Sequence, residues 1–204
     1  MTNRISPLEL VLKRSQELGF LGPNDLMRQI RHSEWWCDLI QPGQRVLDLG
    51  SGGGLPGLVI AIRRDDLSGS LLDSQASRCT FLGDSLTELG LDHRWEIAHG
   101  RAEELAHDSY YRGGFDVVVS RSFGPPAATA ECAAGFLRVG GTLLVSEPPR
   151  SPDRWPPEAL RALGLEPKTL HQGPDVTVQE LCQVELLDDR YPRAVGRPTK
   201  RPLF

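Results

Sequence analysis

The sequence predicts a doubly wound α/β fold, in which helices cover both faces of a mostly parallel, seven-stranded sheet. Short apolar segments alternate with segments of helical periodicity from residue 45 to residue 146, which favours a parallel sheet. A glycine-rich loop follows the first of these apolar segments, as in Rossmann-like sheets that bind nucleotide-like cofactors. A proline- and glycine-containing turn near the end favours a closing hairpin.

The predicted elements follow in a regular order. Helical spacing over 6–18 and 24–40 predicts a small preface of helices before the sheet. The alternating part is predicted as strand 45–49, helix 56–64, strand 69–73, helix 75–89, strand 94–98, a short helix near 101–107, strand 115–120, helix 126–138 and strand 141–146. Segments 165–171 and 176–187 predict two antiparallel strands at the sheet edge, joined by the turn Gly173-Pro174-Asp175. We therefore divide the chain into a helical preface at 1–42, a core domain at 43–189 and a basic, proline-rich tail at 190–204.

Composition limits the class of protein. With 204 residues, 39% hydrophobic content and a formal net charge of -4, the chain can form one well-cored domain and has no global attraction for nucleic acid. The four cysteines and five histidines show no metal-ligand spacing, so we expect neither a metal site nor a disulfide framework. The sequence has no charged-then-apolar leader and no apolar stretch near the roughly 20 residues that span a bilayer. We expect a cytoplasmic protein.

The glycine loop allows two classes of ligand. Counted from Gly52, it satisfies the dinucleotide pattern G-x-G-x-x-G, but counted from the glycine that directly follows the strand, Gly50, it does not, because position 55 is leucine. Pro56 also removes an N–H donor that a pyrophosphate would use at a helix start. The pattern D-x-G-x-G-x-G, met by Asp48 and the glycines at 50, 52 and 54, is that of S-adenosylmethionine-dependent methyltransferases. The ligand of those enzymes carries no phosphate, and bare glycines let the backbone approach it closely.

A second indication lies downstream, at the end of the next strand. Asp73 falls 23 residues after Gly50, and a carboxylate at about 20 residues accepts hydrogen bonds from the ribose hydroxyls of an adenosine cofactor. The alternative is a capping residue for the helix that follows, since aspartate is common at such turns. Asp73 therefore indicates adenosine and leaves the reaction open.

Several longer motifs resemble those of the bacterial 16S ribosomal RNA guanine-N7 methyltransferase family, also called glucose-inhibited division protein B. The resemblance covers the chain from about residue 28 to its end. The family pattern D-[LV]-G-[ST]-G-x-G-[FL]-P-G is met by Asp48 to Gly57, and L-L-D-S-x-x-x-R-x-x-F-L by Leu71 to Leu82. Further matches are Arg101-Ala102-Glu103-Glu104, the strand from Phe115 to Phe123, and the tail from Arg190 to Leu203.

The resemblance implies a class I methyltransferase fold, S-adenosylmethionine as cofactor and 16S ribosomal RNA or the small ribosomal subunit as partner. It implies the cofactor-binding residues Asp48, Gly50, Ser51, Gly52, Gly54, Leu55, Asp73, Ser74, Ala102, Glu103 and Arg121. Candidate substrate residues are Arg121, Phe123 and Glu147 at the strand ends, and Arg190, Arg193 and Arg197 in the tail, which carries no acid after position 189. Phe123 could equally be core packing, and the tail could be a proline-rich strap over the sheet. We expect no catalytic acid or base, because guanine N7 carries a free lone pair.

The sequence also departs from the family pattern near the expected acceptor. Glu147-Pro148 stands where the family usually has a lysine followed by glycine, which reverses a charge. In the family segment R-H-I-x-D-S, Gln29 and His32 occupy the histidine and aspartate positions. Three hypotheses therefore remain open: a guanine-N7 RNA methyltransferase, a paralogue that methylates a small molecule, and a catalytically silent cofactor-binding protein. A dinucleotide oxidoreductase is a distant fourth.

Overall fold

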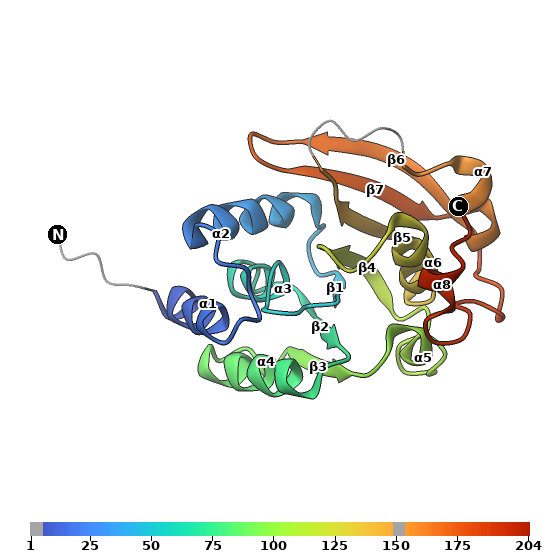
Figure 1. The fold of residues 1–204 in the computed structure, drawn as a ribbon. Helices are drawn as coiled ribbons and strands as arrows, with labels where there is room; N and C mark the ends of the chain where they lie inside the picture. Colours follow the sequence, from blue (N-terminus) through green and yellow to red (C-terminus); the bar gives the residue numbers. More distant parts are fainter. Residues whose placement is uncertain (1–5, 149–153) are drawn as a thin grey trace.

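The computed structural model describes residues 6–148 and 154–204, and these form a seven-stranded sheet (Figure 1). The strand order is β3-β2-β1-β4-β5-β7-β6. Strands β1 to β5 are parallel, and β7 runs antiparallel to both of its neighbours. The strands are β1 (Arg45–Leu49), β2 (Ser68–Asp73), β3 (Trp95–His99), β4 (Phe115–Ser120), β5 (Leu137–Ser146), β6 (Leu165–Gln172) and β7 (Thr177–Gln183). The predicted fold class and the predicted edge hairpin are confirmed.

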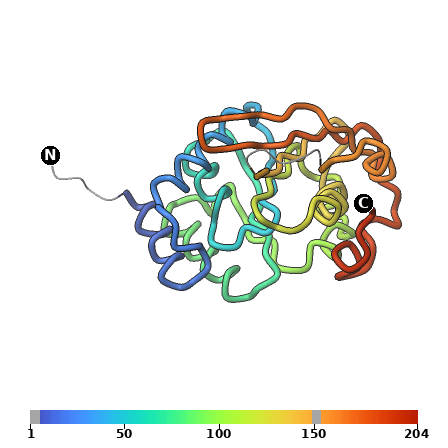
Figure 2. The backbone as a smooth tube through the Cα atoms, turned by 45° about the horizontal axis from the view of Figure 1, so that its top comes forward, coloured from blue at the N-terminus to red at the C-terminus, as the bar shows by residue number. Residues whose placement is uncertain are grey.

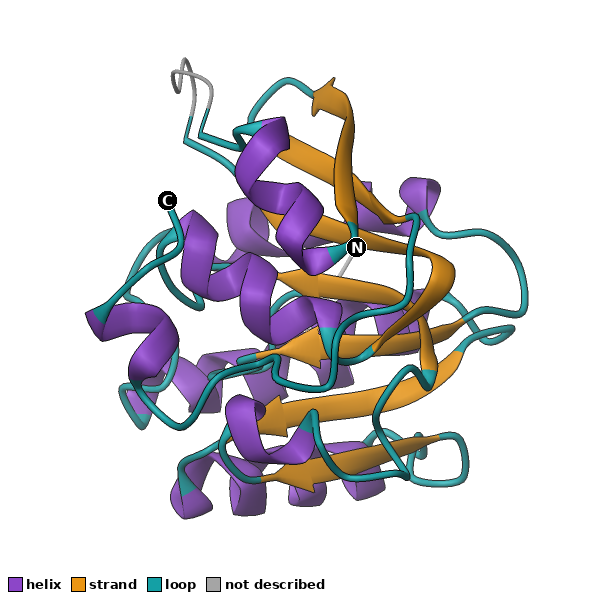
Figure 3. Cartoon of the chain, turned by 90° about the vertical axis from the view of Figure 1, so that its right-hand side faces the viewer, coloured by secondary structure: helices purple, strands orange, loops and turns teal. Residues whose placement is uncertain are grey.

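Helices cover both faces of this sheet, as predicted. The elements are α1 (Pro7–Glu17), α2 (Leu26–Glu34), the 3-10 helix η1 (Trp35–Leu39), α3 (Gly57–Arg63), α4 (Ala76–Glu88), α5 (Ala102–Leu105), α6 (Pro126–Ala134), α7 (Pro157–Leu160), the 3-10 helix η2 (Arg161–Leu163) and α8 (Arg197–Lys200). Figure 1 shows α1 to α4 on one face and α5 to α7 on the other, and Figure 3 shows helices packed against the sheet from another side. None of the helices in the described ranges is both long and apolar enough to cross a membrane.

Alternating strand residues supply two hydrophobic cores. In β1, Val46 packs with α1 to α4, while Leu47 and Leu49 pack with α5 to α7. Both faces are therefore buried, as expected for the central strand of a doubly wound sheet. Chain order reverses at β1, because β2 lies on one side of it and β4 on the other. Ligands of open α/β sheets bind at such a switch point, beyond the carboxyl ends of the strands.

Two predicted helices were wrong in their extent. The segment 24–40 is α-helical only to Glu34 and then tightens into η1, a common way for an α-helix to end. The segment 126–138 is helical only to Ala134, because Gly135 ends the helix and Leu137 already pairs with Phe115 of β4. The last strand ends at Gln183 and not at residue 187, since the next two amides turn away to the Gly164 carbonyl.

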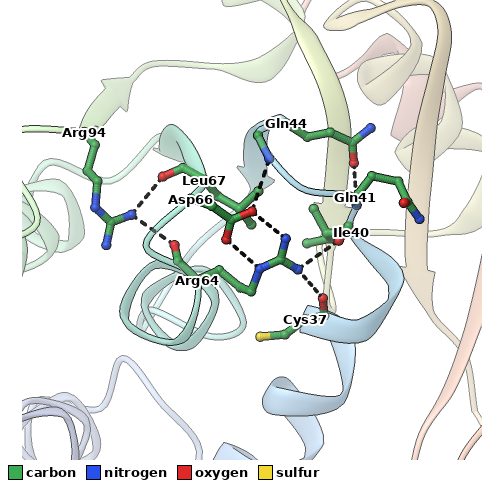
Figure 4. A network of polar contacts seen from close by, with 9 residues as sticks. Cys37, Ile40, Gln41, Gln44, Arg64, Asp66, Leu67 and Arg94 are labelled. Atoms are coloured by element: carbon green, nitrogen blue, oxygen red, sulfur yellow. Dashed lines mark hydrogen bonds and ion pairs between the residues drawn. The ribbon is translucent and has the colours of Figure 1, made fainter.

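The preface is fastened to the sheet by a polar network around Arg64, at the end of α3 (Figure 4). Its guanidinium donates to the backbone carbonyls of Cys37 and Ile40 at 2.7 and 2.8 Å, and to the carboxylate of Asp66. Arg94 in turn donates to the carbonyls of Arg64 and Leu67. These arginines satisfy carbonyls that helix ends leave without intrahelical partners, and they connect the end of the preface to the segment between α3 and β3. Residues 1–5 of the predicted preface lie outside the described residues.

Candidate functional site

The glycine loop after β1 is held in shape by its own backbone. The amides of Gly50 and Ser51 donate to the Leu72 carbonyl, and the Gly54 amide donates to the Ser51 carbonyl at 2.7 Å. Gly50 and Gly54 have φ angles of +77° and +99°, a region that residues with a Cβ rarely adopt. A Cβ on Gly50 would lie 2.7 Å from Cδ2 of Phe123. The loop therefore requires glycine both for its turn and for the approach of Phe123.

Asp48 anchors this loop to the helix that follows. Its Oδ2 accepts a hydrogen bond at 2.9 Å from the backbone N–H of Gly57, and Gly57 is the first residue of α3. Pro56, predicted inside the first helical turn, instead directly precedes it. Asp48 is fully buried, and this burial raises the pKa of its carboxyl to about 7, although the Gly57 hydrogen bond and the charge of Arg121 oppose the rise. Its Oδ1 has no hydrogen-bond partner in the described part of the chain. Asp48 is thus a positioning residue beneath the loop.

A pocket opens beside the loop, at the carboxyl ends of β1 to β4. We call it the glycine-loop pocket; it encloses about 750 Å³, open to solvent. Its lining includes five of the predicted cofactor-binding residues, which are Gly50, Asp73, Ser74, Ala102 and Glu103. The others, Asp48, Ser51, Gly52, Gly54, Leu55 and Arg121, do not line it. Sequence reasoning missed Arg78, Arg101 and Thr199 in its wall. A signal existed for the two arginines, which stand inside the motifs quoted above, and none existed for Thr199.

The Asp73 carboxylate is fixed by two backbone amides at the rim of this pocket. Oδ2 accepts from Gly52 at 3.0 Å and Oδ1 accepts from Gln75 at 2.9 Å, and Arg78 lies 3.6 Å from Oδ2. The N-cap of α4 is Gln75, so Asp73 does not occupy the capping position. A carboxylate oxygen can accept more than one hydrogen bond. Asp73 therefore keeps acceptor capacity toward the pocket that it lines.

Glu103 forms the opposite wall, together with the C-terminal tail. The Gly196 amide donates to Glu103 Oε1 at 2.9 Å, and Arg101 donates to the same oxygen at 3.1 Å. These donors hold the pKa of Glu103 below its usual range, although desolvation opposes them. Oε2 is buried without a partner in the described ranges, in a residue that lines the pocket. An acceptor of this kind fits an amino group of a bound ligand.

The tail is a strap and not an extended arm. Figure 2 shows residues 190–204 folded back beside α6, and Arg197–Lys200 form the short helix α8. Arg193 makes a bidentate ion pair with Glu131 of α6, whose side chain is completely buried. This geometry gives Arg193 a structural task, which corrects its assignment to substrate. Arg190 and Arg197 remain exposed and keep their candidacy.

Arg121, at the end of β4, lies between the loop and the preface. Its Nη2 donates to Oε1 of Gln29 in α2 at 2.9 Å, while its Nη1 is buried with no partner among the described residues. Burial lowers the pKa of Arg121, and the charge of Asp48 opposes that change. Burial also lowers the pKa of His32 to about 4, with the charge of Arg121 as a further cause. Gln29 and His32, the two departures in α2, therefore converge on Arg121.

A second pocket lies at the carboxyl ends of β4 and β5, and we call it the strand-end pocket. It encloses about 740 Å³, open to solvent, and its lining includes Ser120, Glu147, Arg154 and Trp155. Ser122, Phe123 and Gly124 line both pockets, so this segment is the wall between them. Phe123 is half-buried and packs against the second core, so the core-packing role is present, while its contact with the substrate stays a prediction.

Glu147 does not present a free charge to the strand-end pocket. Only 4% of its side chain is exposed, and its carboxylate accepts from Arg154 Nη1 at 3.1 Å and from the indole N–H of Trp155 at 3.0 Å. Among the described residues, Glu147 follows the end of β5 at Ser146, and the next helix, α7, begins at Pro157.

Comparisons with known proteins agree with this architecture. An O-methyltransferase from Bacillus cereus in complex with SAH aligns with a TM-score of 0.61 at 14% identity, over 89% of this chain and 93% of that one. The cyclase SpnF aligns with a TM-score of 0.59 at 22% identity, over 81% of this chain and 71% of the other. A likeness at this level of identity shows the fold alone, because one fold supports different reactions.

Sequence comparison is more specific. The chain is 35% identical over 172 residues to a ribosomal RNA small subunit methyltransferase G from Moorella thermoacetica, covering 80% of this chain and 71% of the relative. A protein of the same description from Mycobacterium leprae is 40% identical over 142 residues, covering 67% of this chain and 56% of the relative. The model of one family matches residues 9–154, which include the glycine loop and both predicted carboxylates, Asp73 and Glu103. The chain therefore belongs to the rRNA small subunit methyltransferase G family.

Proposed function

We propose that this protein transfers the methyl group of S-adenosylmethionine to N7 of a guanine in 16S ribosomal RNA. Family membership supports methyl transfer to small-subunit RNA, and the motif resemblance supports guanine N7. The observation that carries the proposal is the wall shared by the two pockets. A methyl donor in the glycine-loop pocket and an acceptor base in the strand-end pocket would meet at Ser122, Phe123 and Gly124. With this substrate, we propose a cytoplasmic location for the protein.

The residues of the glycine-loop pocket fit S-adenosylmethionine. Asp73 would accept from the ribose hydroxyls, and the unpartnered Oε2 of Glu103 would accept from the adenine amino group. Gly50 leaves its main chain bare on the pocket side, so that the ligand can approach closely. A pyrophosphate fits poorly here, because the carboxylates of Asp73 and Glu103 line the pocket and the charges of Arg78 and Arg101 are already paired with them. The chemistry of the lining thus favours the phosphate-free cofactor over a dinucleotide.

The chain's own contribution to the reaction is placement. When bound, S-adenosylmethionine supplies an electrophilic methyl group on a sulfonium. Guanine N7 carries a free lone pair and loses no proton on methylation, so no residue has to act as a general base. Phe123 would orient the base by stacking, and its ring would help to exclude water from the transfer path. In this mechanism, pocket shape and not acid-base chemistry sets the rate.

The test is a labelling experiment with three acceptors. The full chain is incubated with methyl-labelled S-adenosylmethionine and either naked 16S RNA, 30S subunits or a metabolite extract, and RNA is digested to nucleosides. Label in 7-methylguanosine is the expected result. The Asp73→Asn variant should lose at least about tenfold in transfer, because its amide would oppose the N–H groups of Gly52 and Gln75. Asp65→Ala, which removes an exposed carboxylate, is the matched control. Label confined to metabolites, or to another nucleoside, would contradict the proposal.

A further inference from the structure

The strand-end pocket carries chemistry that the proposed mechanism has not used. At its carboxyl end β5 presents Glu147, where the family pattern usually has a lysine. By sequence alone, this replacement puts a negative charge next to the acceptor and would repel a phosphate. In the structure the Glu147 side chain is almost fully buried, and both of its oxygens accept hydrogen bonds. Glu147 lines the pocket, but its carboxylate is already paired with Arg154 and hydrogen-bonded by Trp155.

Arg154 faces solvent where Glu147 does not. About a third of its side chain, 32%, is exposed, and Arg154 lines the strand-end pocket. A guanidinium has several N–H donors in a fixed planar array, and the contact with Glu147 uses those on Nη1. The indole N–H of Trp155 donates to the other oxygen of the Glu147 carboxylate, and this second hydrogen bond orients the ion pair. A cation therefore lies beside position 147, and it comes from seven residues further along the chain.

The same pocket has two further features of a binding site. Ser120 is 1% exposed, lines the pocket, and its Oγ has no hydrogen-bond partner within residues 6–148 and 154–204. A buried hydroxyl without a partner is costly unless a ligand satisfies it. Ser122, in the wall between the pockets, has φ of +63°, which is uncommon outside glycine. Backbone of this kind concentrates at ligand sites.

We propose that the strand-end pocket receives the acceptor nucleotide, and that Arg154, held in place by Glu147, binds its phosphate. The inference rests on the proposed function and adds to it the acceptor site and its specificity-determining cation. Glu147 is a positioning residue, because it acts only through Arg154. The glutamate at position 147 therefore does not make the pocket repel a phosphate, because its charge is paired with Arg154, whose guanidinium offers the positive charge instead.

The decisive measurement is the salt dependence of RNA methylation by the full chain. With Arg154→Ala, we expect KM for 16S RNA to rise roughly tenfold, while kcat and the Kd for S-adenosylmethionine by calorimetry stay unchanged. The slope of log(1/KM) against log salt should become shallower by about 0.7 to 0.9, the value for one phosphate contact. Arg154→Lys should restore the slope, because it restores the charge without the planar geometry.

Two comparisons separate this role from a structural one. Arg138→Ala removes an arginine from the opposite end of β5 that is also paired with an acid, Asp116, and should leave both KM and slope unchanged. Glu147→Gln should raise KM in the wild-type background and add little to Arg154→Ala, as expected if it acts through Arg154. An Arg154→Ala variant that methylates RNA with unchanged KM and slope overturns this inference and leaves the proposed function intact. A wild-type protein that labels no RNA overturns both.

Discussion

The ion pair between Arg193 and Glu131 gives the sharpest test of the structure. Glu131 has no exposed side-chain surface, and Arg193 supplies three of its hydrogen bonds, from Nε and the backbone N–H to Oε1 at 2.8 Å and from Nη2 to Oε2 at 2.6 Å. These contacts also raise the pKa of Arg193, which keeps it charged. Arg193→Ala would leave the buried carboxylate with the backbone donor alone. Breaking a buried pair in this way costs about 3 to 5 kcal/mol.

The cost should lie near the lower limit, about 3 kcal/mol, because Arg193 keeps 23% of its side chain exposed and water can reach the vacated position. A loss of that size is a large part of the stability of a typical domain, which is about 5 to 15 kcal/mol. Urea denaturation measures it as a lower midpoint at constant slope. Because Gly196 and Thr199 follow in the same strap and border the glycine-loop pocket, calorimetry should also show weaker binding of S-adenosylmethionine.

Two variants make the result specific. Arg190→Ala removes a neighbouring tail cation whose side chain is 69% exposed and should change the free energy of unfolding by less than about 0.5 kcal/mol. Adding Glu131→Gln to Arg193→Ala should recover much of the loss, because no unpaired charge is then buried. The reasoning is refuted if Arg193→Ala is as mild as Arg190→Ala. It is also refuted if Arg193→Ala leaves stability intact and instead reduces the salt dependence of RNA methylation.

Three further predictions concern single residues. For Asp48, the folded-state pKa of about 7 lies above the ordinary pKa of an aspartate, 3.8, so the folded state binds more protons than the unfolded state between these values. The protein therefore loses stability as pH rises through that window, by up to about 4 kcal/mol from this group. The stability of Asp48→Asn relative to wild type should increase from pH 4 to pH 7, and a pH-independent difference would contradict the burial argument. A residue with a Cβ loses roughly 1 to 2 kcal/mol of folding free energy in a left-handed backbone conformation. Gly50→Ala should lose more than this in urea denaturation, because its Cβ would also meet Phe123. Gly43→Ala is the control: Gly43 has φ of +74° and no atom within 4 Å of the position that a Cβ would take, so this variant should lose the backbone part alone. Burial raises the pKa of the Cys132 thiol, so a thiol reagent should modify the half-buried Cys182 before Cys132 in the native protein. Mass spectrometry measures the two rates. Equal rates would contradict this prediction and would show that α6 opens readily.

Local sequence patterns were sufficient for the order of the elements and for the glycine loop. The alternation from residue 45 to residue 146 predicted the sheet because the central strands β1 and β4 are buried on both faces and read as apolar runs. Hydrophobic periodicity gave the wrong boundary where one apolar segment runs from the end of helix α6 into strand β5. Phe136 and Leu137 continue the helical spacing of α6, yet they belong to the approach and start of β5, and only pairing with Phe115 decides between the two.

The site was harder to predict because the sequence gives the charge of each residue but does not tell whether that charge is exposed or paired inside the fold. Arg193 looked like part of a basic tail, but it neutralises a glutamate 62 residues away in sequence, which no local pattern reveals. Glu147 looked like a reversed charge beside the acceptor, but it is turned toward Arg154 and an indole N–H. Both errors have the same origin: a buried ionised group needs a partner, and the fold supplies that partner. Burial therefore decides which charges stay at the surface, and in the described tail the exposed cations are Arg190, Arg197, Lys200 and Arg201, whereas Arg193 is paired with Glu131.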